Sequence, residues 1–563
     1  MKDTKLISRI GYSDLFPKLK NNNELLYNIN TELALELLVI INKFESQLHT
    51  ESSSELKFIL NEWLADSKKE LKDKIVHRYV ELVNKQGGRK GTTIDLSEIK
   101  IINRIATLRT MEILISQANI NNVTIQDKST TLENVFKLYL WVNDEIADRQ
   151  DILFKKWLSK IDDPACEIRF HLYLGLSHVD MTGEKNSKKL MSEVVKFVIF
   201  EKWIKNKVAH NNVMEEFLQK VVSKDWYDYF SKVFHLNNIA INEFKISKNN
   251  YPDLWVILDY FSTHEEINME WGELTILRKK PLYQMRNGDY LILDFGFMID
   301  KFFSGTYHDL IELSKSHSSN FHLDYSKGFV EETLLVNALR ATFGKSYIQY
   351  SESTIKEKKN KGINSLALPD YYMRNGNKIF VFECKNSFLS NDHKVSMNCD
   401  LIEEDIKNKF VDNQGKKKAI KQLINFIQNS IEGKYIFFDN IKKQSNCCYY
   451  PVLVITDNTI TSMGFNKLFN EYLEDELSAL PPEVQKRIKS LTIIHINDFL
   501  YYNTLLKKLD NEIINYQSFL KKQTAIDSMI SFSSYLDLER LREKKSMNKK
   551  IFEAFIRDSF LSK

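Results

Sequence analysis

The fold of this chain is decided by the segment Lys378-Ile379-Phe380-Val381-Phe382-Glu383-Cys384-Lys385, which is rich in β-branched and aromatic residues. Such a composition over a short run predicts a β-strand. The pair Asn375-Gly376 comes just before it and is a strong signal for a hairpin turn. We therefore expect an antiparallel partner strand that begins near Leu368-Pro369-Asp370. Because side chains at positions i and i+2 of a strand share a face, Glu383 and Lys385 point the same way, and the hairpin can bring Asp370 onto that face.

Two carboxylates and a lysine on one face suit the hydrolysis of a phosphodiester with the help of a hard divalent cation. Mg²⁺ prefers oxygen ligands, usually one or two carboxylates together with waters and phosphate oxygens. Asp370 and Glu383 can supply the carboxylates, and the main-chain carbonyl of Cys384 can be a further ligand. Lys385 can orient the attacking water or stabilise the charge that develops on the phosphate. We predict a Mg²⁺ or Mn²⁺ site at Asp370, Glu383 and the Cys384 carbonyl, with Lys385 as a catalytic residue.

At these residues the sequence resembles the PD-(D/E)xK nuclease superfamily, which includes many restriction and repair nucleases. The resemblance covers about residues 321–498, roughly a third of the chain. It implies a core that runs helix, three-stranded meander, helix, strand, and this order can be followed in the sequence. The strands after the second helix are expected at 449–457 and 491–496.

The first helix of this core is expected at residues 327–344, because Gly344 is a natural C-terminal stop. The resemblance implies a further acidic ligand on this helix, facing the sheet. At α-helical spacing, Glu332 shares the stronger apolar stripe, which is formed by Leu335, Val336, Leu339 and Phe343. Glu331 shares a weaker stripe and is the alternative. We predict that Glu332 is a catalytic and metal-binding residue.

The second helix is expected at residues 416–428, with a clean apolar face and a lysine-rich amino-terminal side. The resemblance implies that a lysine or glutamine from this helix lies near the scissile phosphate. Lys418 and Gln422 lie one turn apart on one face and are the candidates for substrate binding. A solvated charged face is the alternative for any single lysine here.

The character of the sequence changes along the chain, which predicts several domains. We expect four segments in chain order: an all-α domain at 1–237, a small β or α+β unit at 238–312, the nuclease core at 313–498 and a helical C-terminal segment at 499–563. Strands of the second segment are expected at 254–258, 273–277 and 290–294, with a hairpin turn at Asn287-Gly288. The predicted fold class is multi-domain, with an α/β restriction-endonuclease-like core whose mixed sheet is flanked by helices.

The composition is that of a soluble globular protein in a reducing compartment. Apolar residues make up 43% of the chain and the net charge is only +4, so any basic surface must be local. Lysine clusters at 356–361, 416–421 and 544–550 are candidates for contacts with backbone phosphates. The five cysteines form no C-x-x-C pair, and no apolar run reaches the length of a membrane span. We expect a cytoplasmic protein without a membrane segment.

The sequence therefore predicts a Mg²⁺-dependent endonuclease that hydrolyses DNA, in a setting of bacterial restriction or anti-phage defence. Its expected partner is nucleic acid, with a homo-oligomer or a partner defence protein as further candidates. Two alternatives stay open. One is a catalytically silent nuclease-fold module that binds nucleic acid or assembles a complex, and the other is an RNase with the same core.

Overall fold

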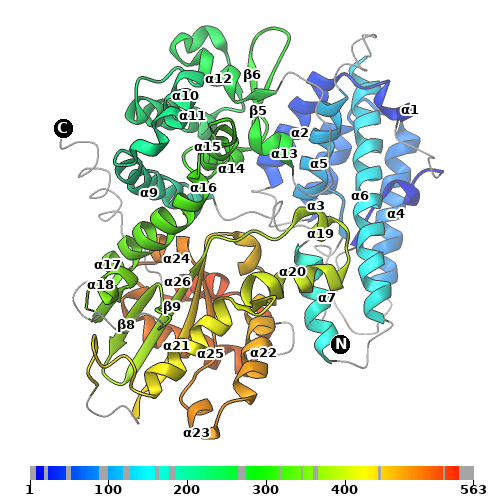
Figure 1. Cartoon of the computed structure of the whole chain (residues 1–563). Coiled ribbons are helices and arrows are strands. Elements are labelled where there is room, and N and C mark those ends of the chain that lie inside the picture. The colour runs from blue at the N-terminus through cyan, green and yellow to red at the C-terminus, as the bar shows by residue number, and fades with distance from the viewer. Residues whose placement is uncertain are drawn as a thin grey trace. The chain divides into compact units, whose positions relative to one another are not determined.

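The computed structural model describes residues 8–17, 23–45, 52–87, 99–117, 127–158, 164–176, 186–263, 274–317, 319–343, 347–358, 366–441, 446–523 and 527–543. The chain separates into two compact units, each assembled from segments that are distant in sequence (Figure 1). Unit 1 comprises Met1–Lys155, Met181–Gly183 and Leu218–Lys301. Unit 2 comprises Lys156–Asp180, Glu184–Phe217 and Phe302–Lys563.

Unit 1 is mostly helical. At its centre lies α5 (Arg104–Ser116), in which every residue from Ile105 to Ile115 is buried. Asn103 caps this helix, because its side chain accepts a hydrogen bond from the amide of Ala106. The other helical elements of the unit are η1 (Tyr12–Asp14), α1 (Asn23–Leu26), α2 (Thr31–Glu45), α3 (Ser52–Phe58), η2 (Ile59–Trp63), α4 (Lys69–Gly87), α6 (Lys128–Leu158), α11 (Trp226–Asn242), η5 (Lys248–Asn250), η6 (Pro252–Leu254), α12 (Trp255–Tyr260), α13 (Thr275–Lys279) and α14 (Phe295–Asp300).

The strands of unit 1 form two small sheets. The strands are β1 (Ser8–Arg9), β2 (Ile99–Lys100), β3 (Lys245–Ile246), β4 (Ser262–Thr263), β5 (Leu282–Gln284) and β6 (Tyr290–Ile292). β1 pairs with β2, and the other four are ordered β3-β6-β5-β4. β5 and β6 form the predicted hairpin, with Gly288 at a positive φ of 86°.

Two of the strands predicted for this part of the chain are wrong. The apolar run at 254–258 lies largely in helix α12, and 274–277 lies in and just before helix α13. Pro252 opens the helical turn η6 directly before α12, and proline favours the first turn of a helix. Short apolar runs do not distinguish a buried helix from a strand by periodicity, so proline was the stronger signal here.

Unit 2 combines helices with one larger sheet. Its helical elements are α7 (Pro164–Leu176), α9 (Asn186–Ile204), η4 (Val208–His210), α10 (Asn211–Lys220), α15 (Ser304–Ser316), α16 (Phe321–Asp324), η7 (Tyr325–Leu335), α17 (Val336–Phe343), α18 (Glu352–Glu357), α19 (Asn391–Val395), α20 (Cys399–Phe410), α21 (Ala419–Ile431), η9 (Asn458–Thr461), α22 (Phe465–Ser478), α23 (Pro482–Gln485), α24 (Ile496–Tyr501), η10 (Leu506–Lys508), α25 (Leu509–Lys522), η11 (Asp527–Met529) and α26 (Phe532–Glu543).

The sheet of unit 2 has five strands in the order β13-β12-β9-β8-β7. These strands are β7 (Ile348–Ser351), β8 (Tyr371–Asn375), β9 (Lys378–Lys385), β12 (Cys448–Ile455) and β13 (Thr492–His495). β7, β8 and β9 form an antiparallel meander, whereas β9, β12 and β13 run parallel. The strand predicted at 378–385 is therefore confirmed as the central strand of a mixed sheet. A separate two-stranded ribbon pairs β10 (Asp412–Asn413) with β11 (Lys416–Lys417).

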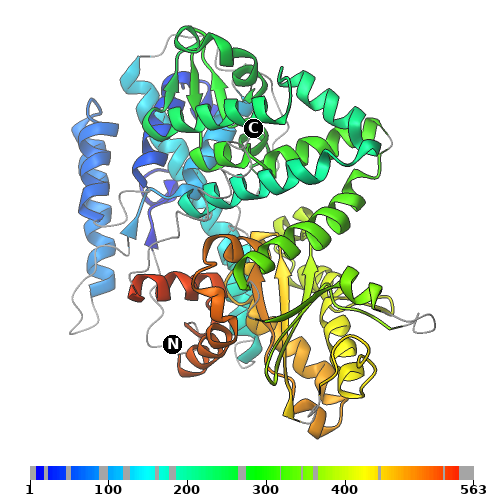
Figure 2. The same ribbon diagram turned by 90° about the vertical axis from the view of Figure 1, so that its left-hand side faces the viewer.

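Helices cover both faces of this sheet (Figure 2). Tyr371 and Tyr372 are consecutive in β8 and so point to opposite faces. The Tyr372 ring contacts Phe426 of α21, with ring centroids 6.3 Å apart. Tyr371 interacts with Arg340 of α17. Helix α21 therefore covers one face, and α17 covers the other.

The hairpin between β8 and β9 turns at Gly376 and Asn377, one residue later than predicted. Asn375 remains in the ladder and pairs with Lys378. Gly376 has a φ of 59°, a left-handed conformation that glycine adopts without a steric penalty. The predicted hairpin itself is confirmed.

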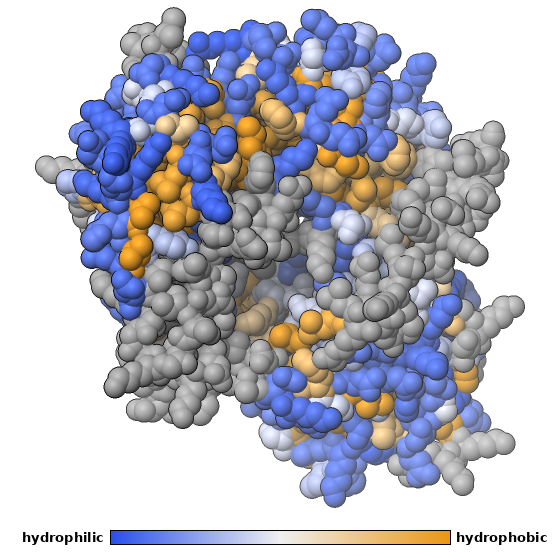
Figure 3. All heavy atoms as spheres, turned by 180° about the vertical axis from the view of Figure 1, so that it is seen from behind, coloured by the Kyte–Doolittle hydropathy of each residue, from blue (hydrophilic) through white to orange (hydrophobic). Residues whose placement is uncertain are grey.

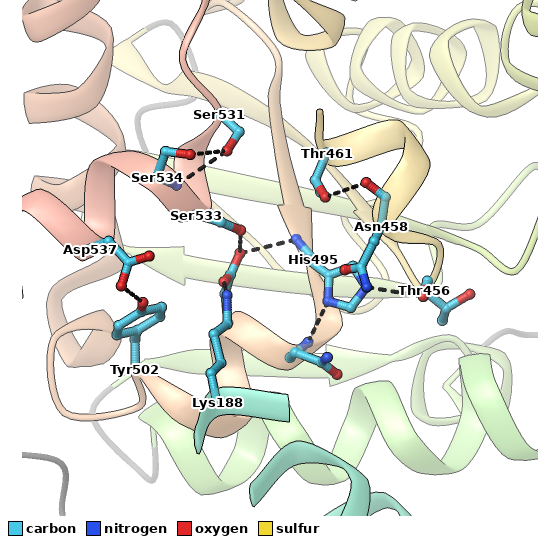
Figure 4. Close-up of polar contacts among 12 residues, drawn as sticks. Lys188, Thr456, Asn458, Thr461, His495, Tyr502, Ser531, Ser533, Ser534 and Asp537 are labelled. Carbon is cyan, nitrogen blue, oxygen red and sulfur yellow. Dashed lines mark hydrogen bonds and ion pairs between the residues drawn. The ribbon is translucent and has the colours of Figure 1, made fainter. Parts of the chain in front are cut away.

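A buried polar network ties α9 to the C-terminal elements of unit 2 (Figure 4). Lys188 Nζ donates to Asp498 Oδ1 at 2.7 Å, and Ser533 Oγ donates to Asp498 Oδ2 at 2.6 Å. The amide of His495 donates to the same Oδ2 at 3.2 Å. Lys188 and Asp498 are both almost fully buried, so each charge depends on the other for compensation.

On the face in Figure 3, hydrophilic side chains predominate and apolar ones form patches between them. Within the described ranges, no helix combines the length and the apolar character needed to cross a bilayer.

Candidate active site

The β8–β9 hairpin brings Asp370 opposite Glu383. Tyr371 pairs with Phe382 at the start of β8, and continuing this register by one residue sets Asp370, just before the strand, opposite Glu383. Residues directly opposite one another in an antiparallel pair point to the same face. This register therefore places the carboxylates of Asp370 and Glu383 on one face, as predicted.

The Asp370 carboxylate is fixed by the backbone of β9. Its Oδ2 accepts a hydrogen bond from the Cys384 amide at 2.6 Å. The N–H and C=O groups of one strand residue point toward the same neighbouring strand. The main-chain carbonyl of Cys384 therefore lies on the same side of β9 as Asp370. A carbonyl that serves as a further metal ligand has to face this side.

Glu383 and Lys385 form a close ion pair on the strand. Glu383 is only 3% exposed, and Lys385 Nζ donates to its Oε1 at 2.6 Å. The side chain of Cys384, between them, is fully buried on the other face. The two-residue period of the strand thus places the acid and the base together.

Burial and crowding shift the pKa values of this cluster. Burial, followed by the negative charge of Asp370, raises the pKa of Glu383 to about 8. Burial also raises the pKa of Asp370, against the attraction of Lys385 and the Cys384 amide. Burial lowers the pKa of Lys385, but the negative charges of Glu383, Asp370 and Glu331 outweigh it, and the pKa is raised. The raised pKa values show that the carboxylates destabilise one another when they are ionised, and a bound cation would relieve this repulsion.

The acidic residue that the first core helix directs to this cluster is Glu331, and the prediction of Glu332 is wrong in placement. Glu332 is exposed, whereas Glu331 is partly buried. Burial and the charge of Asp370 raise the pKa of Glu331 to about 7, and Lys385 acts in the opposite direction. These interactions place Glu331, the alternative considered from the sequence, within electrostatic range of both catalytic candidates.

The winding of the helix explains this difference. The apolar stripe that contains Glu332 assumes an α-helix, but η7 (Tyr325–Leu335) is a π-helix. A π-helix closes its hydrogen bonds from i to i+5 and has more residues in each turn. Each residue then advances by a smaller angle, and the stripe that faces the sheet passes through Glu331. Helix α17 continues from Val336 with ordinary α-helical winding.

Lys418 and Gln422 lie at the amino-terminal end of α21. The helix begins at Ala419, and Lys418 is its N-cap residue, so the predicted start at 416 is wrong. Residues 416 and 417 belong instead to the ribbon strand β11. Gln422 is partly buried, and its side-chain Oε1 has no hydrogen-bond partner among the described residues.

The position of Gln422 along the direction of the strands follows from a contact at the other end of α21. Ser430 Oγ lies 3.1 Å from the Tyr449 hydroxyl at the start of β12. Eight helical residues back from Ser430, Gln422 lies about 12 Å further along the sheet, which is the length of about four strand residues. That distance leads from Tyr449 to Leu453, the partner of Glu383 in the ladder. Gln422 therefore lies toward the end of the sheet that carries the carboxylate pair, and its side-chain oxygen has no hydrogen-bond partner among the described residues.

Two further groups near the site were missed by the sequence reasoning. Glu352 opens α18, and its amide donates to the Asp370 carbonyl at 3.1 Å. Its negative charge raises the pKa of both Asp370 and Glu331. No spacing in the sequence marks Glu352, since it follows β7, the edge strand of the meander. Asn386 directly follows Lys385 and forms hydrogen bonds with Ser326 and Thr456. Its position next to the motif is the feature of the sequence that could have indicated it.

The three predicted lysine clusters differ in what the structure describes. The cluster at 544–550 lies outside the described residues, and the cluster at 356–361 is described only to Lys358. Lys356 Nζ pairs with Glu352 at 2.8 Å. The cluster at 416–421 is fully described and borders the site through Lys418.

The donor set at this place fits a hard divalent cation. Asp370 and Glu383 offer carboxylate oxygens, and the Cys384 carbonyl faces the same side. Mg²⁺ uses one or two carboxylates in most protein sites, with waters completing its shell. Within the described part of the chain, no three His, Cys, Asp or Glu side chains are grouped closely enough to hold a metal ion by themselves. The arrangement thus suits a cation that also takes oxygens from water and substrate.

Comparisons with known proteins gave no match. No protein-family model, no curated protein and no solved structure is similar to this chain at a significant level.

Proposed function

We propose that this chain is a Mg²⁺- or Mn²⁺-dependent nuclease that cuts DNA internally, and that unit 2 contains a restriction-endonuclease-like core. The observation that carries the proposal is the convergence of Asp370, Glu383 and Lys385 at the end of the central strand of a mixed sheet. The order of elements supports it: η7 with α17, the β7–β8–β9 meander, α21 and the parallel strand β12 follow the order that the sequence resemblance implies.

The residues of the chain divide the chemical work. When bound, a divalent cation supplies positive charge to the phosphate and lowers the pKa of water. Asp370 and Glu383 would hold it, with the Cys384 carbonyl beside them and Glu331 adding negative charge. An ammonium group has three donor protons, and Lys385 uses one of them on Glu383. The others are available to orient the attacking water or to contact the phosphate.

Gln422 and Lys418 would contact the substrate from α21. The Gln422 oxygen has no hydrogen-bond partner among the described residues, and it would accept a hydrogen bond from the attacking water. Lys418 lies one residue before the helix and is partly buried, where a cation can approach a phosphate. As the resemblance implies, the 3′ oxygen would leave, and the product would carry a 5′ phosphate. A role in restriction or anti-phage defence is a proposal that rests on this resemblance.

The proposal is tested by incubating the full chain with plasmid, linear duplex DNA, single-stranded DNA and RNA in Mg²⁺, Mn²⁺ or EDTA. We expect metal-dependent cutting of DNA that is abolished by Asp370→Ala and by Lys385→Ala. Cutting of RNA alone would replace the proposal with an RNase that has the same core.

Two other outcomes would overturn the proposed activity. Cutting that survives both substitutions would arise outside this site. If the wild type cuts nothing and its affinity for Mg²⁺ equals that of Asp370→Ala, the chain is a silent module.

A further inference from the structure

A small β-ribbon joins α20 to α21. Its strands, β10 and β11, pair antiparallel around Gln414 and Gly415. Both turn residues have positive φ, 52° and 83°, as in a type I′ turn. Glycine adopts such angles freely, but they are uncommon for glutamine. The amide of Gly415 donates to Asp412 Oδ1 at 2.7 Å, so the turn is held in this strained form.

The exposed surface of the ribbon carries cations and amides. Asn413, Gln414, Lys416 and Lys417 are all exposed. Within the described residues neither lysine forms an ion pair, and Lys417 Nζ has a long contact of 3.5 Å with the amide oxygen of Asn425. The acid of the ribbon, Asp412, is paired with Lys421 at 3.3 Å. The ribbon therefore presents an unbalanced positive charge to solvent.

The ribbon leads into the helix on which the substrate-binding candidate Gln422 lies, and Lys418 lies between the two. The amide of Lys418, which follows β11, donates to the Val411 carbonyl at 2.9 Å, so the ladder leads directly into α21. Ala419 lies eleven residues before Ser430, about 16 Å along the helix. That length corresponds to about five strand residues from Tyr449, which is the level of Cys384 in the neighbouring strand. The base of the ribbon thus lies toward the end of the sheet at which Glu383 and Lys385 lie.

We propose that the β10–β11 ribbon enters the major groove of duplex DNA beside the scissile phosphate, an inference that rests on the proposed nuclease function. The major groove of B-form DNA is wide enough to admit a two-stranded β-ribbon. Lys416 and Lys417 contact backbone phosphates, and Asn413 and Gln414 face base edges, where amide side chains bind adenine. The major groove of duplex RNA is too narrow and deep for this approach. The ribbon therefore selects duplex DNA.

The test is the salt dependence of binding by the full chain, measured by fluorescence anisotropy in EDTA with labelled duplex DNA and duplex RNA. Each lost phosphate contact should lower the slope of log affinity against log salt by about 0.9. We expect Lys416→Gln with Lys417→Gln to lower the slope by about 1.8 and Lys416→Arg with Lys417→Arg to preserve it. Duplex RNA should bind more weakly, with a slope that the glutamine pair leaves unchanged.

A matched control lies at the opposite end of the sheet. Lys486 and Lys489 flank Ile488, which bridges to Tyr449 at the start of β12. Changing both to glutamine should leave the slope unchanged. Gln414→Gly relieves the strained turn, so it should keep the fold and the slope while it weakens any preference for adenine-containing sites.

The possible results separate the ribbon from the nuclease site. An unchanged slope in the glutamine pair, equal binding of duplex RNA or absence of DNA binding by the wild type would each overturn the ribbon proposal. Because the assay contains no metal, it does not depend on cleavage. A wild type that cuts DNA while the ribbon variants keep the full slope would leave the nuclease standing and remove the ribbon. If the wild type cuts nothing and binds Mg²⁺ no better than Asp370→Ala does, while the glutamine pair lowers the slope, the nuclease proposal fails and the ribbon remains as a DNA contact.

Discussion

Replacing Glu331 with glutamine should stabilise the metal-free protein and weaken its affinity for Mg²⁺. Burial and the charge of Asp370 raise the pKa of Glu331 from 4.5 to about 7. At about 1.36 kcal/mol for each pKa unit, the charged form of Glu331 costs the fold about 3 kcal/mol at a pH well above 7. An acid with a raised pKa stabilises the fold fully at low pH, and this stabilisation is lost as the pH rises through about 7.

The adjacent Glu332 provides the matched control, because it is exposed and carries the same charge. Urea unfolding without metal should show Glu331→Gln more stable than wild type by up to about 3 kcal/mol at pH 8, with little difference near pH 4. Glu332→Gln should change the unfolding free energy by less than about 0.5 kcal/mol. Calorimetric titration with Mg²⁺ should show an affinity about 10- to 100-fold lower for Glu331→Gln alone.

Opposite effects on stability and on metal affinity cannot come from simple damage to the fold. The reasoning would be refuted if Glu331→Gln and Glu332→Gln behaved alike in both experiments. It would also be refuted if Glu331→Gln destabilised the metal-free protein at pH 8 and bound Mg²⁺ as well as wild type does.

Three further outcomes are expected. Lys385→Met should reduce single-turnover cleavage by at least about 100-fold while it retains Mg²⁺ binding in calorimetry, and a loss of both together would assign Lys385 to metal binding instead. Because the pKa of Glu383 is raised to about 8, the metal-free protein should lose stability between about pH 4.5 and pH 8. In thermal melts, the melting temperature of Glu383→Gln should depend less steeply on pH than that of wild type. An equally steep dependence would assign the titration to another group. Lys188→Met removes the cation that pairs with the buried Asp498, so it should lower the free energy of unfolding in urea by about 3–5 kcal/mol. Adding Asp498→Leu to the same chain should partly reverse this loss.

The features that depend on local sequence could be predicted well. The run at Lys378–Lys385 forms the predicted strand, because β-branched and aromatic residues fill a strand that is buried on both faces. The turn before it also forms, since Gly376 supplies the left-handed backbone that the connection needs. The strand period predicts that Glu383 and Lys385 share a face, and the hairpin signal predicts that Asp370 joins them.

The features that depend on helical winding or on distant elements could not be predicted in this way. An α-helical spacing of the apolar residues predicts that Glu332 faces the sheet. The π-helical winding of η7 places Glu331 there instead. No local signal marks such winding. Residues 416 and 417 were assigned to the helix, yet the Gln414-Gly415 turn pairs them with β10. Glu352 reaches the site only because β7 pairs with β8. The residues next to Glu352 in the sequence give no indication of this pairing.

The most direct test of the central claim is single-turnover cleavage of supercoiled plasmid by wild type and Glu383→Gln, with Mg²⁺ and with EDTA, followed by analysis of the cut ends. Only wild type with Mg²⁺ should cut, and the cut ends should carry 5′ phosphates and 3′ hydroxyls. Cutting by Glu383→Gln at the wild-type rate, cutting in EDTA, or ends with 3′ phosphates would contradict this expectation.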